Sequence, residues 1–238
     1  MKLKNYLLAM PLAIAAASVT AVETADWTGP YAGGSLNLTT FTTETSDYWC
    51  WYACDAPGTV AQDVTLSLNG GYDWQLNGGL VLGVELDYST GLDEEENIRW
   101  NGGVDGANWT DELNNVISLR GRMGVAVNQS LLYVTAGFSE ADVSYKAQEV
   151  DQSDPNVYTA EYDDTVSGYV FGAGVEHMLT DAVALKAEYT VSQYESTGGE
   201  CWKRTNDPTS VCNPGENDDA VHWKSTVDMF KVGANYRF

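Results

Sequence analysis

The chain has 238 residues, enough for one large all-β domain or two smaller domains. It carries 34 Asp and Glu residues against 12 Lys and Arg residues, which gives a formal net charge of −22. This excess of acid excludes nucleic acid as a partner, because binding phosphate requires Lys and Arg, and it argues against simple electrostatic docking on anionic lipid.

The first 21 residues have the pattern of a secretory signal peptide. Two lysines precede an apolar run over residues 7–17, and a small-residue cleavage site ends at Ala21. We expect cleavage after Ala21 rather than after Ala25, and the apolar run is too short to remain as a membrane-spanning helix. The predicted mature chain, residues 22–238, is then a single exported domain, whose charge becomes −24 because two lysines and no acid are removed from −22.

The mature chain alternates between apolar and polar residues with a period of two, and no segment has a convincing helical period. This alternation predicts eight strands, because each run places its apolar side chains on one face and its polar side chains on the other. The predicted strands are approximately residues 29–42, 64–74, 79–88, 115–127, 131–139, 167–176, 182–192 and 230–238.

The predicted connections alternate strictly between short and long. Three are tight turns rich in Asn, Asp or Gly, and four are long connections. An even-stranded membrane barrel has this asymmetry, with short turns toward the periplasm and long loops outside, whereas a soluble sandwich has no reason to sort loops by length. The long connections are predicted at residues 43–60, 92–112, 146–163 and 196–222.

The polar face of the strands carries a balanced set of charges. A soluble lipocalin-like barrel points its apolar residues inward, whereas a membrane barrel points them toward lipid. Four acids and four bases on this face, in a mature chain of −24, suggest ion pairs in a confined interior, where an unpaired charge would cost several kcal/mol. The alternative is a scattered, solvated surface. The eight residues are Glu85, Asp87, Arg120, Arg122, Glu176, Lys186, Glu188 and Lys231.

An even number of cysteines in an oxidising compartment suggests disulfides. Sequence alone allows three pairings of Cys50, Cys54, Cys201 and Cys212, and we favour Cys50–Cys54 and Cys201–Cys212 because each pair falls within one predicted loop. A metal site is the rival interpretation, but the spacing CWYAC is not C-x₂-C and the two histidines form no ligand cluster. We expect no cofactor.

The two ends of the mature chain carry the most specific motifs. Lys231, Gly233, Tyr236 and the terminal Phe238 resemble the C-terminal signal of bacterial outer-membrane proteins, in which the barrel-assembly machinery recognises the last strand. The stretch DWTGPYAGGSLNL, residues 26–38, is similar to the first strand of small porin-like surface proteins of the OmpA-type barrel family, although Pro30 replaces a bulky residue.

This resemblance implies an all-β protein of the bacterial outer membrane, surrounded by lipid and lipopolysaccharide. The expected fold is an eight-stranded antiparallel up-and-down transmembrane β-barrel, with short periplasmic turns and long extracellular loops.

The leading functional hypothesis is a non-enzymatic barrel that acts through its loops, in surface interaction, adhesion or envelope integrity. Eight strands leave an interior just wide enough for side chains to fill. Tyr48, Trp49, Trp51 and Tyr52 form a candidate contact surface for a host or cell-surface ligand, although they could equally pack on one another or on the barrel rim.

Three other functions stay open. The first is a small porin-like channel. The second is an outer-membrane enzyme, either a lipid A deacylase, which needs a Ser beside a His, or an omptin-like protease, which needs Asp and His at the outer rim. Met178 and Leu179, not a nucleophile, follow His177, so His222 near Asp218 and Asp219 is the arrangement to examine. The third is divalent cation binding by the acids at residues 93–96, which lack EF-hand spacing.

Overall fold

A computed structural model describes residues 25–47, 59–100, 105–151, 157–195, 197–201, 203–204, 207–210 and 220–238. These residues are β-strands and connecting turns. The described part of the chain has no helix that is long and apolar enough to cross a bilayer. The strands are β1 (Gly29–Asp47), β2 (Thr59–Gln75), β3 (Leu80–Trp100), β4 (Asp105–Val127), β5 (Ser130–Asp151), β6 (Val157–Met178), β7 (Val183–Tyr194), β8 (Thr197–Cys201), β9 (Lys203–Arg204), β10 (Asp207–Ser210) and β11 (Ala220–Arg237).

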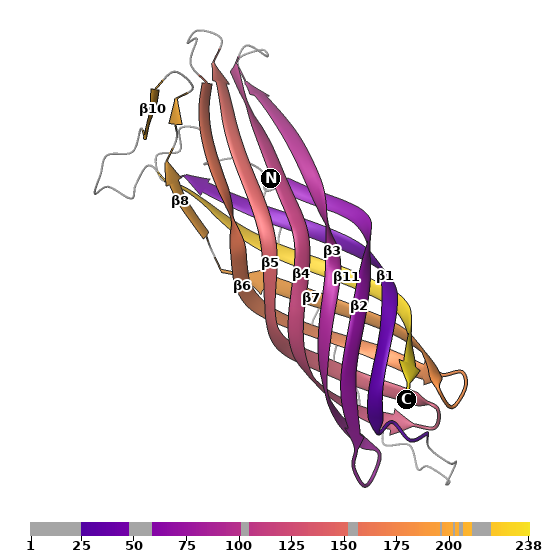
Figure 1. Ribbon diagram of the computed structural model, residues 1–238. Coiled ribbons are helices and arrows are strands. Elements are labelled where there is room, and N and C mark those ends of the chain that lie inside the picture. Colours follow the sequence, from indigo (N-terminus) through magenta and orange to yellow (C-terminus); the bar gives the residue numbers. More distant parts are fainter. Residues whose placement is uncertain are drawn as a thin grey trace, which may run out of the picture.

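Eight of these strands close into a barrel (Figure 1). Each strand from β1 to β7 pairs antiparallel with the next, β7 pairs with β11, and β11 returns to pair with β1 over the register Tyr31↔Arg237 to Asp47↔Val221. Three short strands lie outside this ring: β8 pairs with β11, β9 pairs with β6, and β10 pairs with β9. The predicted fold class, an eight-stranded antiparallel barrel, is confirmed.

The tight turns all lie at one end of the barrel, together with the C-terminus (Figure 1). Gly78 and Gly79, between β2 and β3, both have φ above +80°, and Asn128, between β4 and β5, has φ 57°. Glycine and asparagine tolerate this left-handed region better than other residues, which explains the turn chemistry in the sequence. We call this the turn end and the opposite one the hairpin end.

Over the half of the barrel next to the turn end, the faces are arranged as in a membrane protein. Leucine, valine and aromatic side chains point outward and are exposed, for example Leu68 at 70% and Leu119 at 59%, whereas polar side chains are buried inside. A continuous apolar exterior of this size is stable only against lipid. We call this part, which extends to Tyr88, Phe138 and Tyr169, the membrane half.

Toward the hairpin end the arrangement inverts. Phe41, Val143, Tyr145 and Trp223 point inward, into one buried apolar cluster, while outward residues of β5 such as Glu140 are polar. Tyr145 lies at the centre of an aromatic stack, with ring centroids 5.5 Å from Trp223 and 6.5 Å from Phe41. This part, the outer half, is therefore built like a water-soluble β-protein.

The strands of β3 to β6 are much longer than a membrane requires. They contain 21, 23, 22 and 22 residues, whereas a transmembrane strand needs about 9–11. The predicted bounds of the connections at 92–112 and 146–163 are therefore wrong, because strand structure continues through most of both ranges (Figure 1). The polarity of the faces inverts there, and a register shift between Leu113 and Asn115 also breaks the alternation of β4.

Two seams divide the outer half into two sheets. Within the described residues, β2–β3 pairing ends at Ser67↔Ser89 and β6–β7 pairing ends at Gly168↔Tyr194; β2, β3 and β6 continue beyond these points, whereas β7 ends at Tyr194. Beyond the seams, β3–β6 form one sheet and β2, β1 and β11 belong to another, and the apolar cluster contains residues from both.

At each seam a carboxylate accepts a hydrogen bond from a backbone amide at the strand edge. Asp63 accepts from the amide of Val64 at 2.6 Å, and Asp164 accepts from the amide of Thr165 at 2.8 Å. Side chains that satisfy edge amides protect an open strand from pairing with other chains.

Candidate functional site

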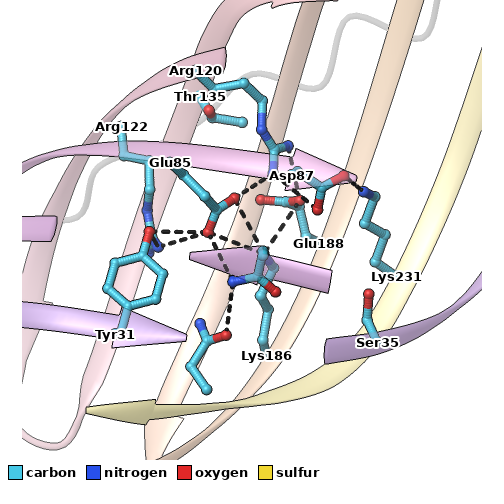
Figure 2. Close-up of polar contacts among 12 residues, drawn as sticks. Tyr31, Ser35, Glu85, Asp87, Arg120, Arg122, Thr135, Lys186, Glu188 and Lys231 are labelled. Carbon is cyan, nitrogen blue, oxygen red and sulfur yellow. Dashed lines mark hydrogen bonds and ion pairs between the residues drawn. The ribbon is translucent and has the colours of Figure 1, made fainter. Parts of the chain in front are cut away.

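The interior of the membrane half holds a network of ion pairs centred on Glu85 (Figure 2). The Glu85 carboxylate accepts hydrogen bonds from the guanidinium of Arg120, from Arg122 at 3.3 Å and from the ammonium of Lys186 at 3.2 Å. The Tyr31 hydroxyl donates a further bond to it at 2.9 Å. Three cations therefore share the single Glu85 carboxylate. Glu85 and all three cations are buried away from water.

Several of these contacts cross the lumen. In the ring of eight strands, β3 and β7 are four positions apart in either direction, so they lie on opposite walls. Lys186 on β7 nevertheless reaches Glu85 on β3, and Arg120 on β4 reaches Glu188 on β7 at 2.9 Å. Lys231 on β11 reaches Asp87 on β3 at 2.5 Å. The side chains therefore fill the barrel from wall to wall.

Two further charged residues join this network and were not included in the predicted set. Arg237 donates to Asp73 at 2.9 Å, near the turn end, and lies 3.8 Å from Glu176. Glu176 also accepts from Arg122 at 2.7 Å. Both missed residues stand on the polar faces of the predicted strands, and adding them keeps the network balanced. The described interior of the membrane half then contains five acids and five bases, namely Asp73, Glu85, Asp87, Glu176, Glu188, Arg120, Arg122, Lys186, Lys231 and Arg237.

Small polar side chains fill the space between the ion pairs and the outer half. The Asn37 amide donates to Ser67 at 2.6 Å, Ser67 and Ser89 lie 2.6 Å apart, and Thr39 and Thr65 lie 2.7 Å apart. Buried hydroxyls that bond one another in this way need no water. Ion pairs, hydroxyls and the apolar cluster thus succeed one another along the axis of the barrel.

The four residues of the C-terminal motif lie on β11 or directly after it, and their side chains point to different sides of the barrel wall. Lys231 points inward to Asp87, and a side chain at Gly233 would collide with the Gly34 carbonyl of β1. Tyr236 and Phe238 point outward and pack edge to face, with ring centroids 5.0 Å apart.

The remaining predicted loop residues lie mostly outside the described part of the chain. This applies to Cys50, Cys54 and Cys212 and to Tyr48, Trp49, Trp51 and Tyr52. Cys201 ends β8, and residues 93–96 belong to the backbone of β3. Neither the disulfide pairing nor the aromatic contact surface is tested.

A serine–histidine hydrogen bond that the sequence alone did not indicate lies within the described residues. Ser130 Oγ and His177 Nδ1 are 2.9 Å apart, because β5 and β6 pair at these two positions. Both lie at the turn end, and no contact between His177 and a carboxylate is found in the described residues. A catalytic triad needs such a third group to orient the imidazole. The described residues also contain no group of three or more His, Cys, Asp or Glu that could hold a metal ion.

A closed eight-stranded barrel with an apolar exterior and a charge-balanced interior defines a bacterial outer-membrane protein. The chain belongs to the family with the outer membrane protein beta-barrel domain, whose family pattern matches residues 9–238. Its location is the outer membrane of a Gram-negative bacterium, which places lipid and lipopolysaccharide around its exterior.

Curated relatives agree with this family. The chain is 31% identical over 178 residues to a 22 kDa outer membrane protein of Rhizobium leguminosarum bv. viciae, covering 71% of this chain and 65% of the relative, so it spans just under two thirds of that protein's length. It is 26% identical over 192 residues to the 31 kDa outer-membrane immunogenic protein of Brucella melitensis, covering 71% of each.

Among solved structures, the outer membrane protease OmpT from Escherichia coli superposes with a TM-score of 0.57 at 11% identity, covering 91% of this chain and 99% of that one. At this identity the similarity describes the fold alone. Neisserial surface protein A is also similar, at 13% identity, with a TM-score of 0.42 and coverage of 88% and 97%.

Proposed function

We propose that this protein is a non-enzymatic surface protein of the outer membrane, whose extracellular part acts in surface interaction, adhesion or envelope integrity. The observation that carries this proposal is the set of ion pairs between opposite walls, of which Lys186–Glu85 at 3.2 Å is the clearest. A lumen crossed by buried side chains has no route for solutes, which weighs against the porin-like channel. The outer half and the connections beyond it are then the parts that can meet a partner.

Two other observations support an exposed working surface. The strands of β3–β6 carry their hairpins far beyond the membrane half, so residues at the hairpin end stand away from lipid (Figure 1). The Brucella relative is described as immunogenic, which is consistent with surface exposure in that protein.

An enzymatic function has less support. The Ser130–His177 pair lacks a carboxylate contact in the described residues and lies at the turn end, away from the outer leaflet. The similarity to OmpT concerns fold only. If overexpression left the mass of lipid A unchanged, the deacylase alternative would be excluded as well.

The adhesion proposal is tested with the aromatic residues of the first extracellular connection. Bacteria that display the protein are compared with bacteria that display a Trp49→Ala, Trp51→Ala double variant, in adhesion to a host-cell monolayer. Adhesion should fall in the double variant and stay unchanged in Trp74→Ala, a matched tryptophan that faces lipid. Equal adhesion of all three proteins would remove these tryptophans as a contact surface.

We also propose that the barrel-assembly machinery recognises the C-terminal motif formed by Lys231, Gly233, Tyr236 and Phe238. Phe238→Ala removes an outward side chain that contacts only Tyr236 among the aromatic rings of the described residues, and it keeps the backbone amide that donates to the Pro30 carbonyl at 3.1 Å. The amount of assembled, heat-modifiable barrel should fall, while the protein once assembled keeps its stability. An unchanged yield would contradict this role.

A further inference from the structure

The segment that precedes β1 crosses the mouth of the barrel at the turn end. The Ala25 amide donates to the carbonyl of Asn128 at 2.9 Å, and Asn128 lies in the turn between β4 and β5. In the ring of eight strands, β5 is four positions from β1, so this bond joins the segment to the opposite wall. Residues 25–28 therefore bridge the opening rather than continue along the wall.

Trp27 fills the opening below this bridge. Its side chain is fully buried and belongs to an apolar cluster separate from that of the outer half. The cluster draws residues from β3, β4, β5, β6 and β7, so the indole belongs to a packed group to which five strands contribute. Its other members are Val81, Ala126, Leu131, Tyr133, Met178 and Ala184.

Besides the bond from Ala25 to Asn128, three further polar contacts hold the segment in place. The Trp27 amide donates to Gln75 Oε1 at 2.7 Å, and the Gln75 amide donates to the Thr28 hydroxyl at 3.1 Å. The Arg237 guanidinium donates to the Trp27 carbonyl and lies 5.0 Å from the centroid of the indole ring. Because Arg237 also pairs with Asp73, the segment, β2 and the last strand meet at one side chain.

We propose that residues 25–28 are a stopper that closes the periplasmic mouth of the barrel. The buried Trp27 side chain keeps water out of the mouth. Arg237 holds the stopper at the junction where the first and last strands pair. A dry mouth protects the ion pairs above it, since buried ion pairs are stronger where water is excluded. This goes beyond the proposed surface function, which depends on the opposite end of the barrel.

The test measures how fast a charged reagent reaches the mouth. Ala184 lies in the cluster around Trp27 and is fully buried, so an Ala184→Cys substitution reports on access from the periplasmic side. The purified, folded full-length protein that carries this substitution is the parent, and it is treated with a positively charged thiol reagent. The same protein with Ala184 retained gives the background from the native cysteines.

Adding Trp27→Ala to the parent should speed modification of the introduced thiol by about tenfold, which corresponds to about 1.4 kcal/mol of lost closure free energy. Trp74→Ala is the matched control, because Trp74 lies near the turn end but faces lipid and is 47% exposed. It should leave the rate unchanged. Equal rates in the parent and in Trp27→Ala, with heat-modifiable mobility preserved, would overturn the proposal.

A second variant covers the case in which Trp27→Ala does not fold. Gln75→Ala keeps the indole and removes only the acceptor of the Trp27 amide. It should also speed modification of the introduced thiol, by less than the loss of the ring. If the rate is again that of the parent, the segment is not held as a stopper.

Discussion

At the scale of single residues, Glu85 has the greatest consequence for the interior. It balances charge from β4 and from β7, and it fixes the Tyr31 hydroxyl of β1. A buried ion pair is weak evidence for stability, because desolvation offsets much of the attraction, but removing one partner strands the other charge. The interior therefore depends on Glu85 more than on any cation that it contacts.

Replacing Glu85 by Gln should destabilise the barrel strongly. The amide keeps the shape but leaves Arg120, Arg122 and Lys186 with one negative charge too few, at a cost of about 3–5 kcal/mol. Urea unfolding in detergent, followed by heat-modifiable mobility, measures the change. Glu140→Gln alters an exposed glutamate of the outer half and should stay within about 0.5 kcal/mol of the parent. Equal midpoints for the two variants would contradict the central role of Glu85.

A partly exposed carboxylate of the outer half should titrate below its usual range. Hydrogen bonds from Thr165 and then Asn115 lower the pKa of Asp142 from its ordinary value of 3.8. A depressed folded-state pKa means that the stabilisation is present above pH 3.8 and is lost as the pH falls through the lower folded value. In Thr165→Val the pKa of Asp142, followed by NMR of its carboxyl carbon, should rise. An unchanged pKa would show that the Thr165 hydroxyl does not act on this carboxylate.

At the scale of strands, the sequence determines the membrane half well and the outer half poorly. Glu85, Arg120 and Lys186 alternate with leucines and valines, so period and polarity identify the wall and the lumen together. In the outer half, the inward residues become apolar, as at Val143, and the register of β4 shifts after Leu113. A prediction that assumes the same inward and outward polarity along the whole strand therefore makes the strands too short. Trp27 lies in the predicted motif of residues 26–38, but its burial in the barrel mouth was missed, because a buried residue before the first strand leaves no periodic pattern.

The outer half should loosen without opening the membrane half when its aromatic stack is removed. Tyr145 packs on Phe41, Tyr162 and Trp223, and its hydroxyl lies 2.6 Å from Ser225. Tyr145→Ala deletes a buried aromatic side chain, at a cost of about 3–5 kcal/mol. Hydrogen exchange should rise in the outer halves of β3–β6 and stay slow around Glu85 and Arg120. Lys146→Ala, at the exposed neighbouring position, is the control. A uniform rise along the whole of each strand would show that the two halves unfold as one unit.

At the scale of the whole molecule, charge is sorted by compartment. The lumen network contains five acids and five bases of the 34 and 12 in the chain, so the remaining 29 acids and 7 bases lie elsewhere. The membrane half is thus neutral inside, as a buried network must be, and the acidic excess belongs to the rest of the chain. A surface of this sign repels anionic neighbours and favours cationic ones.

Two of the layers that close the lumen, the ion network and the stopper of residues 25–28, lie in series along its axis, and the buried hydroxyls and the apolar cluster lie beyond them. Purified protein in planar bilayers should therefore give no steady current, and neither Trp27→Ala nor the pair Glu85→Ala, Lys186→Ala should conduct alone. The pair removes one charge of each sign, and Arg120 keeps Glu188 while Arg122 keeps Glu176, so the network stays balanced. The triple variant opens both of these levels but leaves the buried hydroxyls and the apolar cluster of the outer half in place, so it too should give no steady current. Steady current from the unmodified protein would overturn the closed lumen and favour the porin-like channel.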